Sequence, residues 1–100
     1  MASDKAYLSY ILDQLSELSD IRFRPMMGEY ILYYCGRVVG GVYDDRLLVK
    51  PVPAARLLMP EAAEEPPYPG AKPMLHVERT DDRIFLAELF RAMLPELPKK

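Results

Sequence analysis

Residues 24–50, RPMMGEYILYYCGRVVGGVYDDRLLVK, contain three short apolar runs separated by two turn signals, Cys35-Gly36 and Asp44-Asp45. Glycine and aspartate tolerate the backbone angles that a tight hairpin requires. Runs of aromatic and β-branched residues between such turns are typical of antiparallel strands. The stretch therefore predicts a three-stranded meander, with strands over residues 29–34, 37–43 and 46–50.

A further strand is predicted immediately before this meander. Residues 21–27, IRFRPMM, begin with an isoleucine and a phenylalanine that alternate with two arginines. Successive side chains of a strand point to opposite faces, so the apolar pair and the arginines are expected on different sides. Pro25 lacks an N–H group, so the strand ends there or lies at a sheet edge. Gly28 is expected in a turn or a bulge.

The N-terminal part of the chain predicts a helix. Leucine and isoleucine recur there at the i, i+3, i+4, i+7 spacing of one buried helical face, which predicts a helix over about residues 4–18. Ser3 or Asp4 is placed to cap its start.

The C-terminal half predicts a short helix, a loop, a strand and a final helix. Pro53 suits the first turn of a helix that runs to residue 59. Residues 60–73 contain five prolines and three glutamates, which predicts a loop without a core. A loop of this length in a small domain is often functional or mobile. A strand over 74–79 follows, and Thr80 or Asp81 caps the final helix.

This order predicts an α+β fold: a helix, three or four strands, a helix, one or two strands, and a helix. Strands linked by hairpins favour an antiparallel sheet with the helices on one face. Gly40 and Gly41 stand inside a predicted strand, which indicates that something approaches the backbone closely there or that the strand bends. We expect a helix packed across the sheet, with a bound ligand as the alternative.

Length and composition narrow the class of protein. One hundred residues predict a single domain over 1–100, with a disordered tail from about residue 96. The net charge of −2 and the pI near 5.4 have the wrong sign for a dedicated nucleic-acid binder. No apolar run reaches the roughly 18–20 residues that span a bilayer, and the N-terminal segment has no apolar core of a signal peptide. The single cysteine, Cys35, suits a reducing compartment, so we expect a cytoplasmic protein without membrane association.

No combination of residues predicts catalysis. Cys35 lies at a predicted turn and His76 lies inside a predicted strand, and there is no second histidine or cysteine to complete a metal site. The glycines at 36, 40 and 41 lie inside a hairpin and do not open a helix, so they do not form a phosphate-binding loop. We therefore expect no enzyme, no catalytic or metal-binding residue and no cofactor.

The surface of the sheet is the remaining candidate site. Tyrosines beside arginines resemble both a protein-binding patch and a platform for stacking bases, although ordinary cross-strand packing also explains them. The tyrosines of the predicted meander are Tyr30, Tyr33, Tyr34 and Tyr43. The candidate interaction face consists of Arg22, Arg24, Met27, Tyr30, Tyr34, Arg37 and Lys50.

A longer motif runs through the same strands. It reads Arg24-x-Met26-Met27-Gly28-x-Tyr30-x-x-Tyr33-Tyr34-x-Gly36, followed by Asp45-x-Leu47-x-Val49-Lys50. This motif resembles the core signature of the TfoX N-terminal domain, the family of the TfoX/Sxy competence regulators. The first helix and residues 68–74 are similar to its stand-alone, single-domain bacterial members. The resemblance covers essentially the whole chain and implies an α-β(3)-α-β(2)-α arrangement, similar to secretion-chaperone-like folds.

The resemblance also implies a role in regulation. Two-domain relatives act with a cyclic-AMP receptor protein at competence promoters and carry a helical C-terminal domain, whereas this chain ends at Lys100. The family supplies no catalytic residues. We therefore expect a small interaction module, linked to transcription, that binds a protein such as a component of the transcription machinery.

Four alternatives stay open at this point, of which a chaperone-like role rests on fold analogy alone. Direct DNA binding would use Arg22, Arg24, Arg37 and Lys50. A small-ligand or enzyme site would lie around Gly40-Gly41, with the proline-rich loop as its lid. Homodimerisation would use the sheet edge or the acidic first helix.

Overall fold

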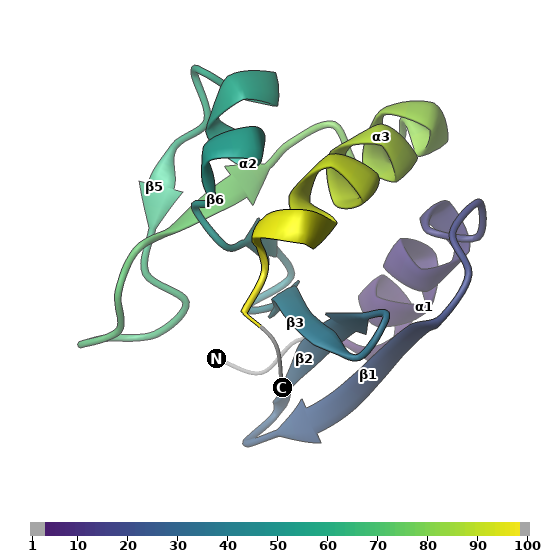
Figure 1. Ribbon diagram of the computed structural model, residues 1–100. Coiled ribbons are helices and arrows are strands. Elements are labelled where there is room, and N and C mark those ends of the chain that lie inside the picture. Colours follow the sequence, from purple (N-terminus) through teal and green to yellow (C-terminus); the bar gives the residue numbers. More distant parts are fainter. Residues whose placement is uncertain (1–3, 99–100) are drawn as a thin grey trace.

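Four consecutive strands joined by tight hairpins form the larger part of the sheet in the computed structural model, which describes residues 4–98 (Figure 1). The elements are α1 (Lys5–Gln14), β1 (Ile21–Met26), β2 (Glu29–Tyr34), β3 (Arg37–Val42), β4 (Leu47–Val49), α2 (Pro53–Leu58), β5 (Glu64–Glu65), β6 (Met74–Val77), α3 (Arg83–Met93) and the short 3-10 helix η1 (Leu94–Glu96). The six strands lie in the order β1-β2-β3-β4-β6-β5, and every neighbouring pair is antiparallel. The predicted α+β class and element order are confirmed.

The hairpins share one turn geometry. Both central residues of each turn have positive φ: Met27 and Gly28, Cys35 and Gly36, Asp44 and Asp45. Type I′ turns require this, and their twist matches the twist of the flanking strands. The two turns predicted from the sequence are confirmed, and Gly28 lies in the turn that joins β1 to β2.

One face of the sheet packs against all three helices. Along β2, buried Tyr30, Leu32 and Tyr34 alternate with half-exposed residues. These side chains share a single core with residues of every helix, including Ile11 of α1 and Phe90 of α3, which are both fully buried. In Figure 1 the helices lie above the strands of the meander. The other face of the sheet carries none of these helices and is called the open face below.

Gly40 and Gly41 are enclosed by the sheet itself, so the predicted packing of a helix at this point is wrong. A Cβ atom on Gly40 would lie 2.1 Å from the carbonyl oxygen of Leu48 in the neighbouring strand. A Cβ atom on Gly41 would lie 2.6 Å from the ring of Tyr43, which folds back over this glycine. Protein atoms therefore fill the space beside both glycines, and a ligand has no room there.

Residues 60–73 contain more structure than the predicted loop without a core. β5 pairs with β6 in this segment, with Glu64 opposite Leu75 and Glu65 opposite Met74. Pro67 is buried. The strand is short because prolines follow it and cannot donate to a ladder. Figure 1 shows the rest of the segment extending from the sheet between β5 and β6.

The ends of the helices differ in part from the prediction. The Asp4 carboxylate accepts a hydrogen bond from the Ala6 amide at 2.9 Å and caps α1, whereas Ser3 lies outside the described residues. α1 ends at Gln14, earlier than predicted. The cap of α3 is Asp82, whose carboxylate accepts from the Phe85 amide at 3.0 Å; the prediction of residue 80 or 81 is wrong.

The C-terminal end packs further along the chain than predicted. Leu97 is 3% exposed and belongs to the core. The disordered tail predicted from about residue 96 was therefore placed too early in the chain. Lys99 and Lys100 lie outside the described residues. Between residues 4 and 98, no helix has the length and apolar character needed to cross a bilayer.

Candidate interaction surface

β1 is an edge of the sheet and pairs with β2 alone. Residues 22–25 of this strand are all exposed. Figure 1 shows no helix or strand on the outer side of β1. The edge position that Pro25 predicted is confirmed.

The backbone groups of β1 alternate between β2 and the free edge. The Cys35 amide donates to the Asp20 carbonyl at 3.0 Å, and the two-residue turn closes the other end of the hairpin. This hydrogen bond and this turn show that the even-numbered residues of β1 are the ones that exchange hydrogen bonds with β2. The backbone groups of Ile21, Phe23 and Pro25 therefore point away from β2. The missing N–H of Pro25 removes no bond from the ladder.

Phe23 lies on the helix-facing side of β1, at the margin of the core. Its ring meets that of Tyr30 edge-on, with centroids 5.9 Å apart. Tyr30 is 9% exposed, whereas Phe23 is 45% exposed because no further strand flanks β1. Phe23 is thus a large aromatic side chain held by the core and still accessible to a partner.

Arg22 and Arg24 lie on the open face of the same strand. The Nε of Arg22 is 3.2 Å from an Asp20 carboxylate oxygen, with 79% of the arginine side chain exposed. An ion pair this exposed contributes little to stability. The Arg24 side chain is exposed and has no ionic partner among residues 4–98. The strand therefore offers one lightly paired and one unpaired positive charge.

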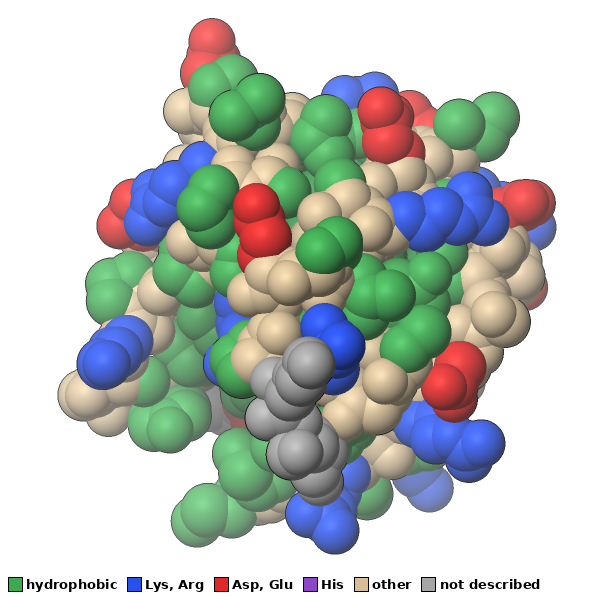
Figure 2. Space-filling model, viewed as in Figure 1, with side chains coloured by type: hydrophobic (Ala, Val, Ile, Leu, Met, Phe, Trp, Pro, Cys, Tyr) green, Lys and Arg blue, Asp and Glu red, His purple; other side chains and the backbone are tan. Residues whose placement is uncertain are grey.

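Met27 stands at the tip of the β1–β2 hairpin and is 97% exposed. Figure 2 shows hydrophobic side chains lying at the surface beside lysines and arginines. We call the group formed by Arg22, Phe23, Arg24, Pro25 and Met27 the β1 surface. It combines apolar and cationic side chains on one free edge.

The seven residues of the predicted interaction face do not lie together. Tyr30 and Tyr34 are 9% and 7% exposed and point into the core, because the alternation of β2 places them on the same side as Leu32. Arg37 also lies on the helix side, where it donates to the Leu94 carbonyl at 2.9 Å. The other four are Arg22, Arg24 and Met27, which are exposed around β1, and Lys50, which is half-buried after β4.

Phe23 is the residue that the predicted face lacked. Because Phe23 alternates with the arginines, the sequence placed it on the apolar side of the strand. Side chains on that side are normally buried in the core, so Phe23 was not expected at the surface. The signal that could have identified it was Pro25, which marks an edge and so indicates that the apolar side is covered from one flank only.

A second small cluster lies in the middle of the open face. Tyr43 and Leu48 are 6% and 0% exposed, although they lie outside the main core. Burial raises the pKa of the Tyr43 phenol above its ordinary value, and the nearby Tyr68, Glu29 and Tyr33 raise it further. Tyr68 belongs to the proline-rich segment, so part of that segment lies near Tyr43.

Glu65 connects the short edge strand β5 to the rest of the sheet. Its carboxylate binds the Arg46 guanidinium, and its Oε2 is 3.2 Å from Nδ1 of His76. The hydrogen bond from Arg46 is the main cause that lowers the pKa of Glu65, and His76 adds to it. His76 thus has a structural partner in the sheet.

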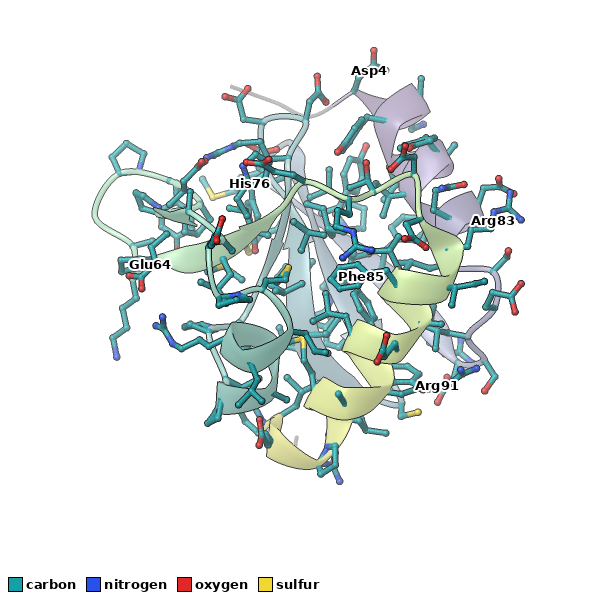
Figure 3. The ribbon with its side chains drawn as sticks, turned by 90° about the horizontal axis from the view of Figure 1, so that it is seen from above. Asp4, Glu64, His76, Arg83, Phe85 and Arg91 are labelled. Atoms are coloured by element: carbon teal, nitrogen blue, oxygen red, sulfur yellow. The ribbon has the colours of Figure 1, made fainter. Side chains whose placement is uncertain are left out.

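A hollow of about 370 Å³ lies between the end of α2, β6 and the start of α3, with Met59, His76, Arg79 and Phe85 in its lining. Figure 3 shows Phe85 directed from α3 toward the interior. The guanidinium carbon of Arg79 is 4.0 Å from the centre of the Phe85 ring, and the same group is 2.9 Å from the Asp82 carboxylate. The arginine in this hollow is therefore already paired with an acid and a ring.

Cys35 lies in a hairpin turn, as the sequence predicted, and its side chain is exposed. Among residues 4–98, no three His, Cys, Asp or Glu side chains gather in a group that could hold a metal ion.

The meander and the helices around it match a known protein family. Residues 13–91 correspond to the TfoX N-terminal domain. The chain belongs to the TfoX N-terminal domain family. This confirms the resemblance seen in the motif of β1–β4.

One relative of this TfoX N-terminal domain is an "uncharacterized 12.7 kDa protein in trpE 5′ region" of Spirochaeta aurantia. It is 40% identical over 72 residues, which make up 72% of the present chain and 63% of the relative. The chain thus spans less than two thirds of the length of that relative. No solved structure matches the chain.

Proposed function

We propose that this TfoX N-terminal domain is a protein-interaction module of a transcription-linked regulator, and that it binds its partner with the β1 surface. The observation that carries the proposal is the position of Phe23, 45% exposed on a free edge and packed against the buried Tyr30. Aromatic and arginine side chains are enriched among the residues that dominate binding energy in protein interfaces.

The motif that identifies the family supports this assignment of the surface. Most of its residues have a clear structural role, since Gly28 and Gly36 take positive φ in turns, while Leu47 and Val49 are fully buried. Met27 shares the β1–β2 turn with Gly28, but its side chain, like that of Arg24, has no such role among residues 4–98. Both are exposed on the β1 surface, which suits recognition better than folding.

The link to transcription rests on the family, because TfoX/Sxy proteins are competence transcription regulators. The proposal for this chain is that it acts through a protein of the transcription machinery, in the cytoplasm.

Direct DNA binding is the second candidate, and the exposed Arg22 and Arg24 are the observation in its favour. The cations predicted to bind DNA do not lie on one face, because Arg37 donates to the Leu94 carbonyl on the helix side. Two arginines neutralise about two phosphates, which corresponds to a log–log salt slope of only about −2. Such a footprint supports weak binding at best.

The test is a tagged pull-down of the full chain from native lysate, with and without nuclease, read by mass spectrometry. A variant carrying Phe23→Ala and Arg24→Ala, called the β1 variant, removes the exposed ring and one of the two arginines of the β1 surface. Tyr30, a residue of the predicted face, is unsuitable for this purpose because it is part of the core. Leu57 and Arg56 are exposed on α2 and give a matched control, Leu57→Ala with Arg56→Ala.

We expect RNA polymerase or a transcription factor in the wild-type and control captures, resistant to nuclease, and its loss from the β1 variant. Equal capture by the β1 variant would contradict the proposed surface. Capture that disappears on nuclease treatment would transfer the assignment to DNA binding.

A further inference from the structure

We propose that the free edge of β1 binds an extended peptide segment in which apolar and acidic residues alternate, and that this segment adds a seventh strand to the sheet. The inference rests on the proposed function, because it names the kind of protein segment that the β1 surface recognises.

Within residues 4–98, the backbone of β1 has unpaired hydrogen-bonding groups along its free edge. Ile21 and Phe23 each direct an N–H and a C=O group away from β2, and Pro25 directs a C=O group alone. Alternate residues repeat every 7 Å or so along a strand, which is the spacing that an added antiparallel strand needs. Strand addition to an exposed edge gains its affinity from such main-chain bonds. Because Pro25 cannot donate, the pairing is complete only along the first half of β1.

The side chains of β1 determine what the added strand carries. Residues placed opposite Ile21 and Phe23 share the helix-facing side, where the half-exposed ring of Phe23 offers an apolar contact. Residues placed opposite Arg22 and Arg24 share the open face, where a carboxylate meets a guanidinium. Directly opposite side chains of a sheet interact, and opposite charges there are favourable. The period of two therefore predicts alternation of apolar and acidic residues.

A second copy of this chain fits the edge poorly. In an antiparallel pair of two β1 strands centred on Phe23, Arg22 of each copy would stand opposite Arg24 of the other, and like charges directly opposite are destabilising. Each Pro25 would also stand opposite an Ile21 without donating to it. Prolines and charges are the usual protection of an edge against self-association.

The strand at the other edge of the sheet, β5, is also a poor partner for β1. β5 has two residues, Glu64 and Glu65. Their carboxylates are already bound to Arg56, at 2.7 Å, and to Arg46. The acidic strand that β1 selects is therefore expected on another protein.

The two arginines differ in availability. Arg22 already has the Asp20 carboxylate at 3.2 Å, so an incoming acid only replaces one partner by another. Arg24 has no ionic partner among residues 4–98, so a carboxylate opposite it makes a new interaction. The acidic residue facing Arg24 is expected to contribute the larger part of the charge selectivity.

The test uses short fluorescein-labelled peptides and the full chain, with fluorescence anisotropy as the readout. One peptide alternates valine and glutamate, a second alternates valine and lysine, and a third has the composition of the first with the valines and glutamates in two blocks. We expect the alternating acidic peptide to bind about tenfold more tightly than either of the others, from the charge pairs and the matched spacing.

Backbone N-methylation separates strand addition from a general attraction of charges. Only every second residue of the added strand donates to β1, so two N-methylated peptides are compared, one methylated at the valines and one at the glutamates. The valines face Ile21 and Phe23 and should be the donors. Methylation there should weaken binding about tenfold or more, while methylation at the glutamates should leave it nearly unchanged.

A charge reversal in the protein completes the test. Arg24→Glu should shift the preference from the glutamate peptide to the lysine peptide. Arg56→Glu, at an exposed arginine on α2, should leave the preference as in the wild type. Equal binding of alternating and block peptides, or equal loss from both N-methylated peptides, would overturn strand addition.

The outcome can be told apart from that of the proposed function. If the β1 variant loses the captured protein while no peptide discriminates, the β1 surface is the interface but strand addition is wrong. If the peptides discriminate while capture is unchanged in the β1 variant, strand addition is supported and the proposed use of this surface is wrong.

Discussion

The ring of Phe23 meets the ring of Tyr30 edge-on, with centroids 5.9 Å apart and planes inclined by 77°. Tyr30 belongs to the core, while Phe23 lies at the free margin of the sheet. The pair therefore extends the packed interior to the surface and holds the exposed ring in one orientation. A ring that is already ordered loses little side-chain entropy on binding, which favours its use as an anchor.

Phe23→Ala should lower the free energy of unfolding by about 1–3 kcal/mol, because it removes a half-buried side chain together with its aromatic pair. Tyr30→Ala should cost about 3–5 kcal/mol, because it empties a buried site. Urea denaturation of both variants measures the difference. Equal losses would mean that Phe23 is a core residue and not an accessible anchor.

Gly40→Ala should destabilise the sheet by at least about 1–3 kcal/mol, since the added Cβ would lie 2.1 Å from the Leu48 carbonyl oxygen and β3 and β4 would have to separate. Val38→Ala, at a half-exposed position of the same strand, should cost about 1 kcal/mol or less. Chemical denaturation of both variants tests this pair. A neutral Gly40→Ala would contradict the close approach of the strands.

Local chemistry explains why the meander could be predicted. The turns Cys35-Gly36 and Asp44-Asp45 contain residue types that accept positive φ, and both are type I′ turns in the structure. Pro25 likewise marked an edge strand through a property of its own backbone.

The misplaced parts depend on tertiary contacts. Both faces of β2 carry large apolar or aromatic side chains, so alternation alone could not show that Tyr30 and Tyr34 face the helices while Ile31 and Tyr33 do not. The strand β5 exists because β6 pairs with it, despite the prolines around it. Successive polar residues before α3 offered several caps, and only the geometry of the helix start selected Asp82.

Gln14→Ala should destabilise the contact between α1 and α3 by about 1–3 kcal/mol, because it leaves a part-buried carbonyl without its donor. The Gln14 amide donates to the Thr80 carbonyl at 2.8 Å and accepts from Arg83 at 3.2 Å. Figure 3 shows Arg83 at the start of α3, near α1.

Asp13→Ala is the matched control for this contact. Asp13 binds the same arginine at 2.8 Å, but the two side chains are 67% and 46% exposed. Its loss should cost no more than about 1 kcal/mol. Thermal or urea unfolding measures both losses. A larger loss of stability for Asp13→Ala than for Gln14→Ala would contradict the role given to Gln14.

Glu65 should make the stability of the protein depend on pH. The hydrogen bond from Arg46, with His76 beside it, lowers the pKa of Glu65 in the folded state below its ordinary value of 4.5. A carboxyl with a lowered folded-state pKa stabilises the protein above its ordinary pKa, and this stabilisation is lost as the pH falls through the lowered value. Unfolding of the wild type and of Glu65→Gln should therefore differ most above pH 4.5 and converge in acid. A difference that stays constant down to acid pH would show that Glu65 acts without its charge.

We propose the β1 edge as the surface that binds a protein partner. The most direct measurement of this binding is amide hydrogen exchange, residue by residue, in the free protein and in complex with the transcription protein identified by the pull-down. We predict that the amides of Ile21 and Phe23, which point to the free edge, exchange at least tenfold or so more slowly in the complex, while those around Leu57 and Ile84 are unchanged. Unchanged exchange at both β1 amides, with protection gained on α2 or α3 instead, would contradict the account.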